Sequence, residues 1–215
     1  MRCGGGVSGR HLCCVRLKMR GARDFASFRF VRSRTRSSSV IRSGATSCLT
    51  RTMPVPFTQT AVVLKIIGVI SDTHGLLRPS AAAALQGCDV IVHAGDIGNP
   101  EVLQALRGLA PVTAVRGNVD AGWAKKIPES AELVVEGWRI LVLHSLAALE
   151  CDPSAEGFEI VISGHSHRPW IERRDGVLYV NPGSAGRRRF RLPIAVARIE
   201  VSAESLEARI VELAE

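Results

Sequence analysis

The sequence predicts an α/β (α+β) domain, a four-layer αββα sandwich in which two mixed β-sheets pack face to face with helices on the outside. Two observations predict this fold class. Short apolar runs alternate with helical segments in the first part of the domain, as in parallel strands joined by right-handed crossovers. In the second part, apolar runs come in pairs around turn residues, as in antiparallel hairpins.

The first part of the domain alternates strand and helix. The predicted strands are residues 66–70, 90–93 and 112–115. A helix is predicted over residues 78–86, because Pro79 lies near its first turn and Gly87 follows its end. A second helix is predicted over residues 100–107, with Gly108 as its stop.

The second part of the domain contains two predicted hairpins. Their paired strands are residues 133–136 with 139–143 and residues 170–173 with 177–180. Gly137-Trp138 separates the first pair and Asp175-Gly176 lies between the second, where it supplies the positive φ angles of a tight turn. The remaining predicted strands are residues 160–162, 194–201 and 206–213.

The positive charge of the chain is concentrated near its N-terminus. The formal net charge is +8, but residues 1–60 hold twelve Lys or Arg residues against Asp24 alone, and the rest of the chain is mildly acidic. We therefore predict a basic, Arg/Ser-rich leader without regular structure at residues 1–62 and a domain at residues 63–215. Three interpretations of the leader stay open: a mitochondrial transit peptide, a start codon assigned too early with Met53 as the true start, and a basic tail that touches nucleic acid non-specifically.

Composition excludes several classes of protein. The sequence contains no apolar stretch of 18 or more residues, so no membrane span is expected. Only Cys88 and Cys151 belong to the predicted domain, too few for a disulfide framework. The sequence contains no Cys-x-x-Cys pair, so a structural zinc site is not expected. A reducing compartment is expected: the cytoplasm, or mitochondria if the leader is a transit peptide.

Five apolar runs each end at residue types that bind metal ions. The blocks that follow these runs are Asp72-Thr73-His74, Gly95-Asp96, Gly117-Asn118, His144 and Gly164-His165-Ser166-His167. Because ligand sites of open α/β sheets lie beyond the carboxyl ends of the strands, we expect the seven donors to form one site. Carboxylate, amide and imidazole donors without thiolate suit Mn²⁺, Fe²⁺, Ni²⁺, Co²⁺ or Zn²⁺.

These five blocks, in this order, resemble those of the calcineurin-like metallophosphoesterases. The opening stretch of residues 67–75 and the later Asn181-Pro182-Gly183-Ser184 resemble the small bacterial and archaeal phosphodiesterase branch of that superfamily. The resemblance covers about residues 65–200. It implies a dinuclear-metal phosphoesterase, most specifically a phosphodiesterase that hydrolyses a small phosphodiester by attack of a hydroxide bridging two metal ions.

The resemblance also implies a role for each donor. Asp72, His74 and His167 are expected to hold the first ion, and Asn118, His144 and His165 the second. Asp96 is expected to bridge the two, so that Asp96, Asn118 and His144 act in catalysis. The resemblance favours Mn²⁺ as the metal, with Ni²⁺, Fe²⁺, Co²⁺, Zn²⁺ or Mg²⁺ as alternatives. Ser145 follows His144 where relatives often have Gly.

The residues near these blocks suggest substrate contacts. Arg116, Arg168 and Ser184 are the predicted contacts, because they lie within a few residues of the blocks or in the late motif. For the run 187–189 with Arg191, a solvated loop is favoured over a phosphate clamp. His93 is expected in the core or behind the ligands, and Asp120 either orients a ligand or faces solvent.

Val119 constrains the expected chemistry. Many relatives carry a histidine at this position that protonates the leaving oxygen, whereas the small phosphodiesterase branch commonly lacks it. Loss of a general acid typically lowers rates about 10²- to 10⁴-fold when the leaving group is poor. A preference for esters with good leaving groups, such as aryl phosphodiesters, is therefore predicted.

Other functions and partners are also considered from the sequence. The alternatives are a nucleotide phosphohydrolase or nuclease of the same superfamily, or a non-catalytic protein-interaction scaffold like the retromer subunit that shares this fold. The expected partner is a small phosphoester substrate, and binding to a membrane is not expected. Nucleic acid is not expected for the domain, and a homodimer or other homo-oligomer is an open prediction.

Overall fold

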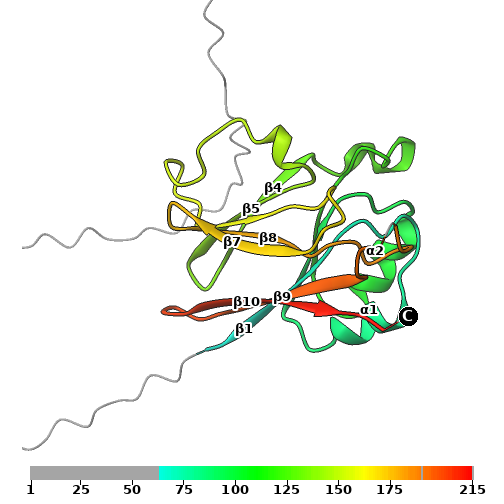
Figure 1. Cartoon of the computed structure of the whole chain (residues 1–215), viewed down its shortest axis with the longest axis horizontal. Coiled ribbons are helices and arrows are strands. Elements are labelled where there is room, and N and C mark those ends of the chain that lie inside the picture. The colour runs from blue at the N-terminus through cyan, green and yellow to red at the C-terminus, as the bar shows by residue number, and fades with distance from the viewer. Residues whose placement is uncertain (1–62, 190, 215) are drawn as a thin grey trace, which may run out of the picture. The chain divides into compact units, whose positions relative to one another are not determined.

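The computed structural model describes residues 63–189 and 191–214 (Figure 1). The predicted leader, residues 1–62, lies outside the described residues, so its interpretations stay predictions. Within the described part of the chain, no helix is long and apolar enough to cross a membrane.

The first sheet has five strands in the order β10-β9-β1-β2-β3. Its parallel strands are β1 (Lys65–Ile70), β2 (Val90–Ala94) and β3 (Val112–Val115), with β3 at the edge of the sheet. The antiparallel strands are β9 (Ala195–Val201), which pairs with β1, and β10 (Leu206–Glu212), which pairs with β9. The predicted alternation of strand and helix thus produces the parallel part of a mixed sheet.

The second sheet also has five strands, in the order β4-β5-β6-β8-β7. Its parallel strands are β5 (Trp138–Leu143), β6 (Ile160–Ile162) and β8 (Val177–Asn181). The antiparallel edge strands are β4 (Ser130–Val135), which pairs with β5, and β7 (Trp170–Arg174), which pairs with β8. This sheet therefore joins the two predicted hairpins through the short strand β6.

Both hairpins close with two-residue turns whose central residues have positive φ. The second turn is Asp175-Gly176, as predicted, with φ of 49° and 83°. The first turn is Glu136-Gly137, one residue earlier than the predicted Gly137-Trp138. The shift arises because Trp138 pairs with Val135 as part of β5, where its indole N–H donates to Ser202 O at 2.7 Å.

The two sheets lie one over the other (Figure 1) and enclose the main core. The side chains that fill this space come from the inner faces of both sheets and include Ile67, Val69, Ile140, Ile160, Ile162 and Ile199, all fully buried. Burial of such aliphatic side chains is worth roughly 1.5–3 kcal/mol each. The contact between the sheets therefore stabilises the arrangement that positions their strand ends.

Two helices cover the outer face of the first sheet. Helix α2 (Pro100–Arg107) has its predicted bounds, because Asn99 Oδ1 accepts the Val102 N–H at 3.1 Å and caps its start. Helix α1 (Pro79–Ala84) is shorter than predicted. Leu85 and Leu106 pack from this layer against the sheet. The Asn99 cap, whose amide also donates to Gly75 O at 3.2 Å, fixes the start of α2 beside the loop after β1.

The outer face of the second sheet is covered differently. There, Leu143 and Val161 pack with Phe158, which belongs to the segment between β5 and β6. Among the described residues this segment contains the 3-10 turn η2 (Leu146–Ala148) and no α-helix; a second such turn, η1 (Gly122–Lys126), follows β3. The predicted fold class is confirmed, with this outer layer formed by an irregular segment.

The contact between the sheets predicts a clear difference between two strand substitutions. Ile160→Ala removes a fully buried side chain from β6 and should lower the free energy of unfolding by about 2–5 kcal/mol. Val134→Ala on the edge strand β4 should change it by under about 0.5 kcal/mol, because Val134 is 65% exposed. Urea unfolding of the full chain measures both. Equal losses would contradict this description of the core.

Candidate metal centre

The chain segments that follow β1, β2, β5 and β6 are hydrogen-bonded to one another at one end of the sandwich. Asp72 N–H donates to Gly95 O at 3.0 Å, and His74 N–H donates to Asp96 O at 2.9 Å. Within the second sheet, the Gly164 N–H donates to His144 O at 2.9 Å. The His165 N–H donates to Asp72 Oδ2 at 3.1 Å and joins the two sheets. Together with the bond from the Val119 N–H to Asp96 Oδ1, these bonds draw the five predicted blocks into a single cluster.

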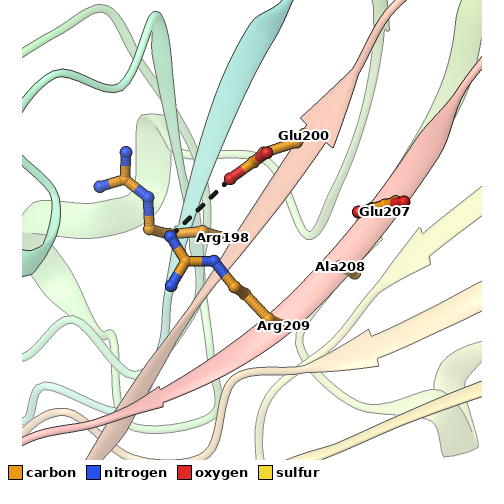
Figure 2. Close-up of a pocket in the computed structure, with 5 residues that line it drawn as sticks. All are labelled: Arg198, Glu200, Glu207, Ala208 and Arg209. Carbon is orange, nitrogen blue, oxygen red and sulfur yellow. Dashed lines mark ion pairs between the residues drawn. The ribbon is translucent and has the colours of Figure 1, made fainter.

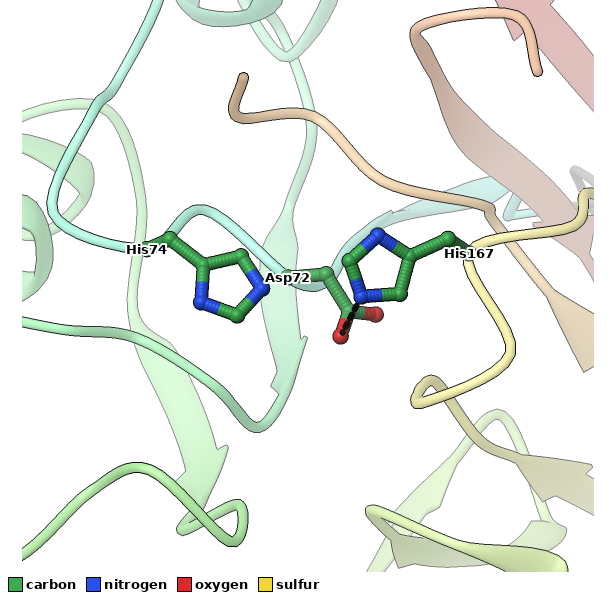
Figure 3. A group of neighbouring side chains, drawn as sticks. All are labelled: Asp72, His74 and His167. Carbon is green, nitrogen blue, oxygen red and sulfur yellow. Dashed lines mark ion pairs between the residues drawn. The ribbon is translucent and has the colours of Figure 1, made fainter. Parts of the chain in front are cut away.

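One half of the cluster contains Asp72, His74 and His167, whose possible ligand atoms lie within 4.8 Å of one another. Figure 3 shows the three side chains converging from the loop after β1 and the loop after β6. His167 Nε2 lies 3.2 Å from Asp72 Oδ1, and the rings of His74 and His167 stack with centroids 5.3 Å apart. The arrangement is compact enough for one ion.

Buried atoms in this half lack hydrogen-bond partners. Asp72 Oδ1 and His74 Nε2 are both buried without one among the described residues. An unsatisfied buried polar group typically costs about 1–3 kcal/mol, more if it is charged. A carboxylate oxygen and an imidazole nitrogen in this state are the donors that a divalent cation would satisfy, so the residues fit a metal ion.

The other half of the cluster contains Asn118, His144 and His165. Asn118 Oδ1 lies 3.1 Å from His144 Nε2 and 3.2 Å from His165 Nδ1, and the two rings meet edge to face with centroids 5.1 Å apart. His144 Nδ1 lies 2.7 Å from Ala94 O, which leaves Nε2 directed at the cluster. This half offers an amide oxygen and two imidazole nitrogens.

Asp96 lies between the two halves. Its Oδ1 is 3.4 Å from His144 Nε2, and its Oδ2 is 3.9 Å from His74 Nε2. The Val119 N–H donates to Oδ1 at 3.1 Å and holds the carboxylate in this orientation. A carboxylate with one oxygen toward each half has the geometry that a bridging ligand requires.

The backbone at the donors adopts a conformation that non-glycine residues rarely take. Of the seven non-glycine residues with positive φ in the described segments, five are predicted ligands, and the other two form hairpin turns. The five are Asp72, His74, Asp96, His165 and His167, with φ between 46° and 67°. Such residues cost about 1–3 kcal/mol each and are retained where the surroundings hold them. Five of the seven predicted donors therefore lie at positions of strained backbone.

Close backbone approach requires glycine at two positions beside the donors. A Cβ at Gly117 would overlap the Asp96 carboxylate, and a Cβ at Gly164 would overlap the Ser71 hydroxyl and approach Asp72 Oδ2. These two glycines therefore allow the loops after β3 and β6 to pack directly against the two carboxylates.

Two buried residues behind the donors hold the loops in place. Asp120 is 6% exposed and accepts the N–H groups of Ile97, Gly98 and Gly117, so of the two open interpretations the structure favours orientation of the ligand loops. His93 is fully buried, and its Nδ1 accepts the Gly95 N–H at 3.2 Å. Its Nε2 therefore carries the proton and donates to Thr73 Oγ1 at 3.0 Å.

Burial and neighbouring charges set the protonation of the donors. Burial raises the pKa of Asp72 to about 6, against the hydrogen bond from Ser71, so the carboxyl is mainly ionised at pH 7. Burial, and next the charge of Arg189, lower the pKa of His167 to about 4 and lower the pKa of His74. These donors are thus in the deprotonated forms that bind metal.

The coupled pair Asp96 and His144 behaves differently. Burial acts to raise the pKa of Asp96, but the hydrogen bonds from His144 and from the Val119 N–H lower it overall. Burial likewise acts to lower the pKa of His144, but the hydrogen bond to Asp96 raises it overall. Each residue of the pair therefore favours the charged form of the other.

The predicted substrate contacts have partners of their own. Arg116 Nη2 forms an ion pair with Glu129, and the buried Ser184 Oγ donates to Asp72 O at 2.9 Å. The Arg168 N–H donates to Ser166 Oγ at 3.3 Å, and its side chain is exposed. Contacts of these three residues with substrate stay predictions. The hydroxyl contacts of Thr73 and Ser184 have no signal in the sequence, since no spacing rule indicates them.

A separate hollow lies on the outer side of β9 and β10 (Figure 2). Arg198 lines it and donates to Ala84 O and Gln86 O at the end of α1, at 2.6 and 3.2 Å. Arg209 pairs with Glu200 at 3.7 Å. Because its charged groups serve the fold, this hollow does not compete with the cluster of donors as the functional site.

The chain resembles known proteins in sequence and in fold. Residues 66–204 match the calcineurin-like phosphoesterase superfamily domain. A probable metallophosphoesterase of Methanothermobacter thermautotrophicus is 33% identical over 158 residues, which are 68% of this chain and 91% of that protein. Phosphodiesterase YfcE of Escherichia coli K12 is 30% identical over 139 residues, which are 53% of this chain and 76% of that protein.

Among solved structures, Vacuolar Protein Sorting 29 from Cryptosporidium parvum has a TM-score of 0.58 at 15% sequence identity, covering 71% of this chain and 99% of that chain. At this identity the likeness shows a shared fold alone.

The contact between Thr73 and His93 predicts an effect on metal binding. Thr73→Val leaves His93 Nε2 buried without its partner and frees the loop between Asp72 and His74. We expect an affinity for Mn²⁺ about 10- to 100-fold lower, as for other residues that orient ligands. Titration calorimetry on the full chain measures this.

The matched control is Thr113→Val on β3, whose hydroxyl forms no hydrogen bond within the described residues. This variant should bind Mn²⁺ like the unsubstituted chain. Equal affinities of both variants and the unsubstituted chain would show that Thr73 does not position the donors.

Proposed function

The chain belongs to the calcineurin-like phosphoesterase superfamily, and from this premise we propose that it is a divalent-metal-dependent phosphodiesterase that hydrolyses a small phosphodiester. The observation that supports the proposal most is the convergence of two carboxylates, an amide oxygen and four imidazoles at the end of the sandwich. Names of relatives support it as well, because one is a probable metallophosphoesterase and another a phosphodiesterase.

We assign the donors to two ions. Asp72, His74 and His167 would hold the first ion, because their ligand atoms lie within 4.8 Å of one another. Asn118, His144 and His165 would hold the second, because Asn118 Oδ1 lies 3.1 and 3.2 Å from the two imidazoles. Asp72 and Asp96 also gather with His144 within 4.8 Å, so the two sites are adjacent. Asp96 would bridge them through its two oxygens. Mn²⁺ is the proposed metal, since oxygen and imidazole donors without thiolate suit it.

Two divalent ions supply Lewis acidity toward water and toward the oxygens of a phosphoester. The protein contributes the positioning and the charge. Asp72 and Asp96 bring two negative charges against about four positive charges of the ions, so the centre attracts a phosphodiester anion. The Val119 N–H fixes Asp96, while the Val119 side chain, 47% exposed, cannot donate a proton. The leaving group must therefore depart without a proton from this position.

Two alternatives stay open. A nucleotide phosphohydrolase or nuclease would use the same donors on other esters. A non-catalytic scaffold would have no need for strained, buried donors without partners, and such donors are what the cluster contains. Metal content combined with a complete lack of phosphoester hydrolysis would favour the scaffold. We further propose a cytoplasmic location, or a mitochondrial one if the leader is a transit peptide, and a homodimer or other homo-oligomer.

The bridging role predicts that Asp96→Asn lowers both metal content and turnover. We expect the bound metal to fall from about two ions per chain to one or fewer, and kcat/KM on bis(p-nitrophenyl) phosphate to fall about 10²-fold or more. Elemental analysis and a chromogenic assay measure the two quantities.

A matched control for Asp96→Asn is Asp89→Asn, which removes a carboxylate that pairs with Lys65 at 2.8 Å on the surface. This control should keep both metal and activity. Full metal occupancy and activity in Asp96→Asn would refute the bridging assignment.

The side chain at position 119 predicts the dependence on the leaving group. Val119→His should raise kcat/KM on alkyl diesters about tenfold or more relative to aryl diesters, because an added general acid helps poor leaving groups most. The measurement is a plot of log kcat/KM against the pKa of the leaving group, whose slope should be less steep for Val119→His than for the unsubstituted enzyme. Val134→His, at an exposed site on β4, is the control and should leave the slope unchanged. Equal rates of the unsubstituted enzyme on alkyl and aryl esters would contradict the proposal.

A further inference from the structure

The segment after β8 is pressed against the loop that carries Asp72 and His74. Ala185 N–H donates to Ser71 O at 3.0 Å, and Ser184 Oγ donates to Asp72 O at 2.9 Å. A Cβ at Gly186 would overlap Thr73 O, so the two backbones touch. In Figure 3 this segment, in pale orange, passes beside Asp72 and His74. Its position is therefore tied to that of the first half of the metal centre.

Further bonds fix the base of this segment. Arg78 Nε donates to Gly186 O at 2.9 Å from the start of α1. On the other side, Ser184 bridges to Ile194, and Ala195 N–H donates to Ser184 O at 3.1 Å. Residues 181–186 are all buried. The fixed base then leads directly into three exposed arginines, Arg187, Arg188 and Arg189, which we call the arginine turn.

The arginine turn places positive charge beside the metal centre. Its first residue, Arg187, follows Gly186, whose backbone lies against Thr73 O between the predicted ligands Asp72 and His74. Within the described part of the chain, Arg187 and Arg189 form no ion pair with a carboxylate. A guanidinium that a protein holds beside a cationic centre without a carboxylate partner is suited to an anion, and its planar donors match a phosphate.

The scissile group of a phosphodiester carries a single negative charge, which the metal ions already attract. The arginine turn is a second source of positive charge beside the metal centre, and this charge suits a second anionic group on the substrate. We propose that the arginine turn, through Arg189 above all, is a subsite for a further phosphate, and that the substrate is a phosphodiester bearing that phosphate on one ester arm. This inference rests on the proposed phosphodiesterase activity. It revises the favoured sequence-based interpretation of residues 187–189 as a solvated loop, because the loop is anchored to the ligands.

Two esters that differ by one phosphate test the proposal on the full chain loaded with Mn²⁺. The probes are the p-nitrophenyl ester of thymidine 5′-phosphate and the same ester with an added 3′-phosphate. We expect kcat/KM to be about 10- to 100-fold higher for the 3′-phosphorylated ester, the effect of one hydrogen-bonded charge pair. In Arg189→Gln this preference should fall below about threefold, mainly through a higher KM for the 3′-phosphorylated ester.

Two variants serve as controls. Arg209→Gln removes an exposed arginine on β10, which pairs with Glu200, and should keep the preference. Arg189→Lys keeps the charge and should retain part of it. A lack of preference in the unsubstituted enzyme would overturn the subsite. So would an equal loss on both esters in Arg189→Gln, because Arg189 would then act on the scissile phosphate or on the fold.

A binding measurement separates this inference from the proposed function. Titration calorimetry compares thymidine 3′,5′-bisphosphate with thymidine 5′-phosphate in the unsubstituted chain and in Arg189→Gln. Tighter binding of the bisphosphate that depends on Arg189, without hydrolysis of any ester, would support the subsite and contradict the proposed function. Hydrolysis without any dependence on Arg189 in either measurement would support the proposed function and overturn the subsite.

Discussion

The placement of Asp72 at the junction of the two sheets is the constraint on which the rest of the centre depends. Its N–H donates to Gly95 O after β2, and its Oδ2 accepts the His165 N–H from the loop after β6. Its carbonyl oxygen accepts Ser184 Oγ from the segment after β8. Three strand ends, from both sheets, are therefore held by one fully buried residue. The core between the sheets keeps those ends at a fixed separation, so packing and site geometry are coupled.

This geometry has a cost in stability that a bound ion would offset. Left-handed backbone at five donors and buried atoms without partners both disfavour the folded chain. A ligand that binds only the folded state stabilises it, by about 2.7 kcal/mol at a free concentration of 100 times Kd. Metal binding is therefore expected to stabilise the folded chain. Burial is the main cause of the pKa shifts of Asp72 and His167, which at pH 7 are a carboxylate and a neutral imidazole, the forms that bind a cation.

Periodicity and turn chemistry were enough to predict the strands and the chain order of the five blocks. Helix α2 ends where it is predicted to end because Gly108 is a local stop signal. Contacts between residues far apart in the chain were not predictable. The bond from Ser184 to Asp72 spans 112 positions, and the bond from Arg78 to Gly186 spans 108. No sequence signal therefore indicated that Ser184 and the segment before the arginine turn are bonded to the loop of Asp72 and to α1. The irregular layer over the second sheet has no periodic pattern, so its form could not be foreseen either.

The central claim is that the seven donors gather two cations at the junction of the sheets. Anomalous diffraction from crystals of the Mn²⁺-loaded protein tests it most directly, with data collected on both sides of the manganese edge. We expect two anomalous peaks about 3.5–4 Å apart, with Asp96 between them. One peak should lie beside Asp72, His74 and His167, and the other beside Asn118, His144 and His165. A single peak, or no peak among these side chains, would contradict it.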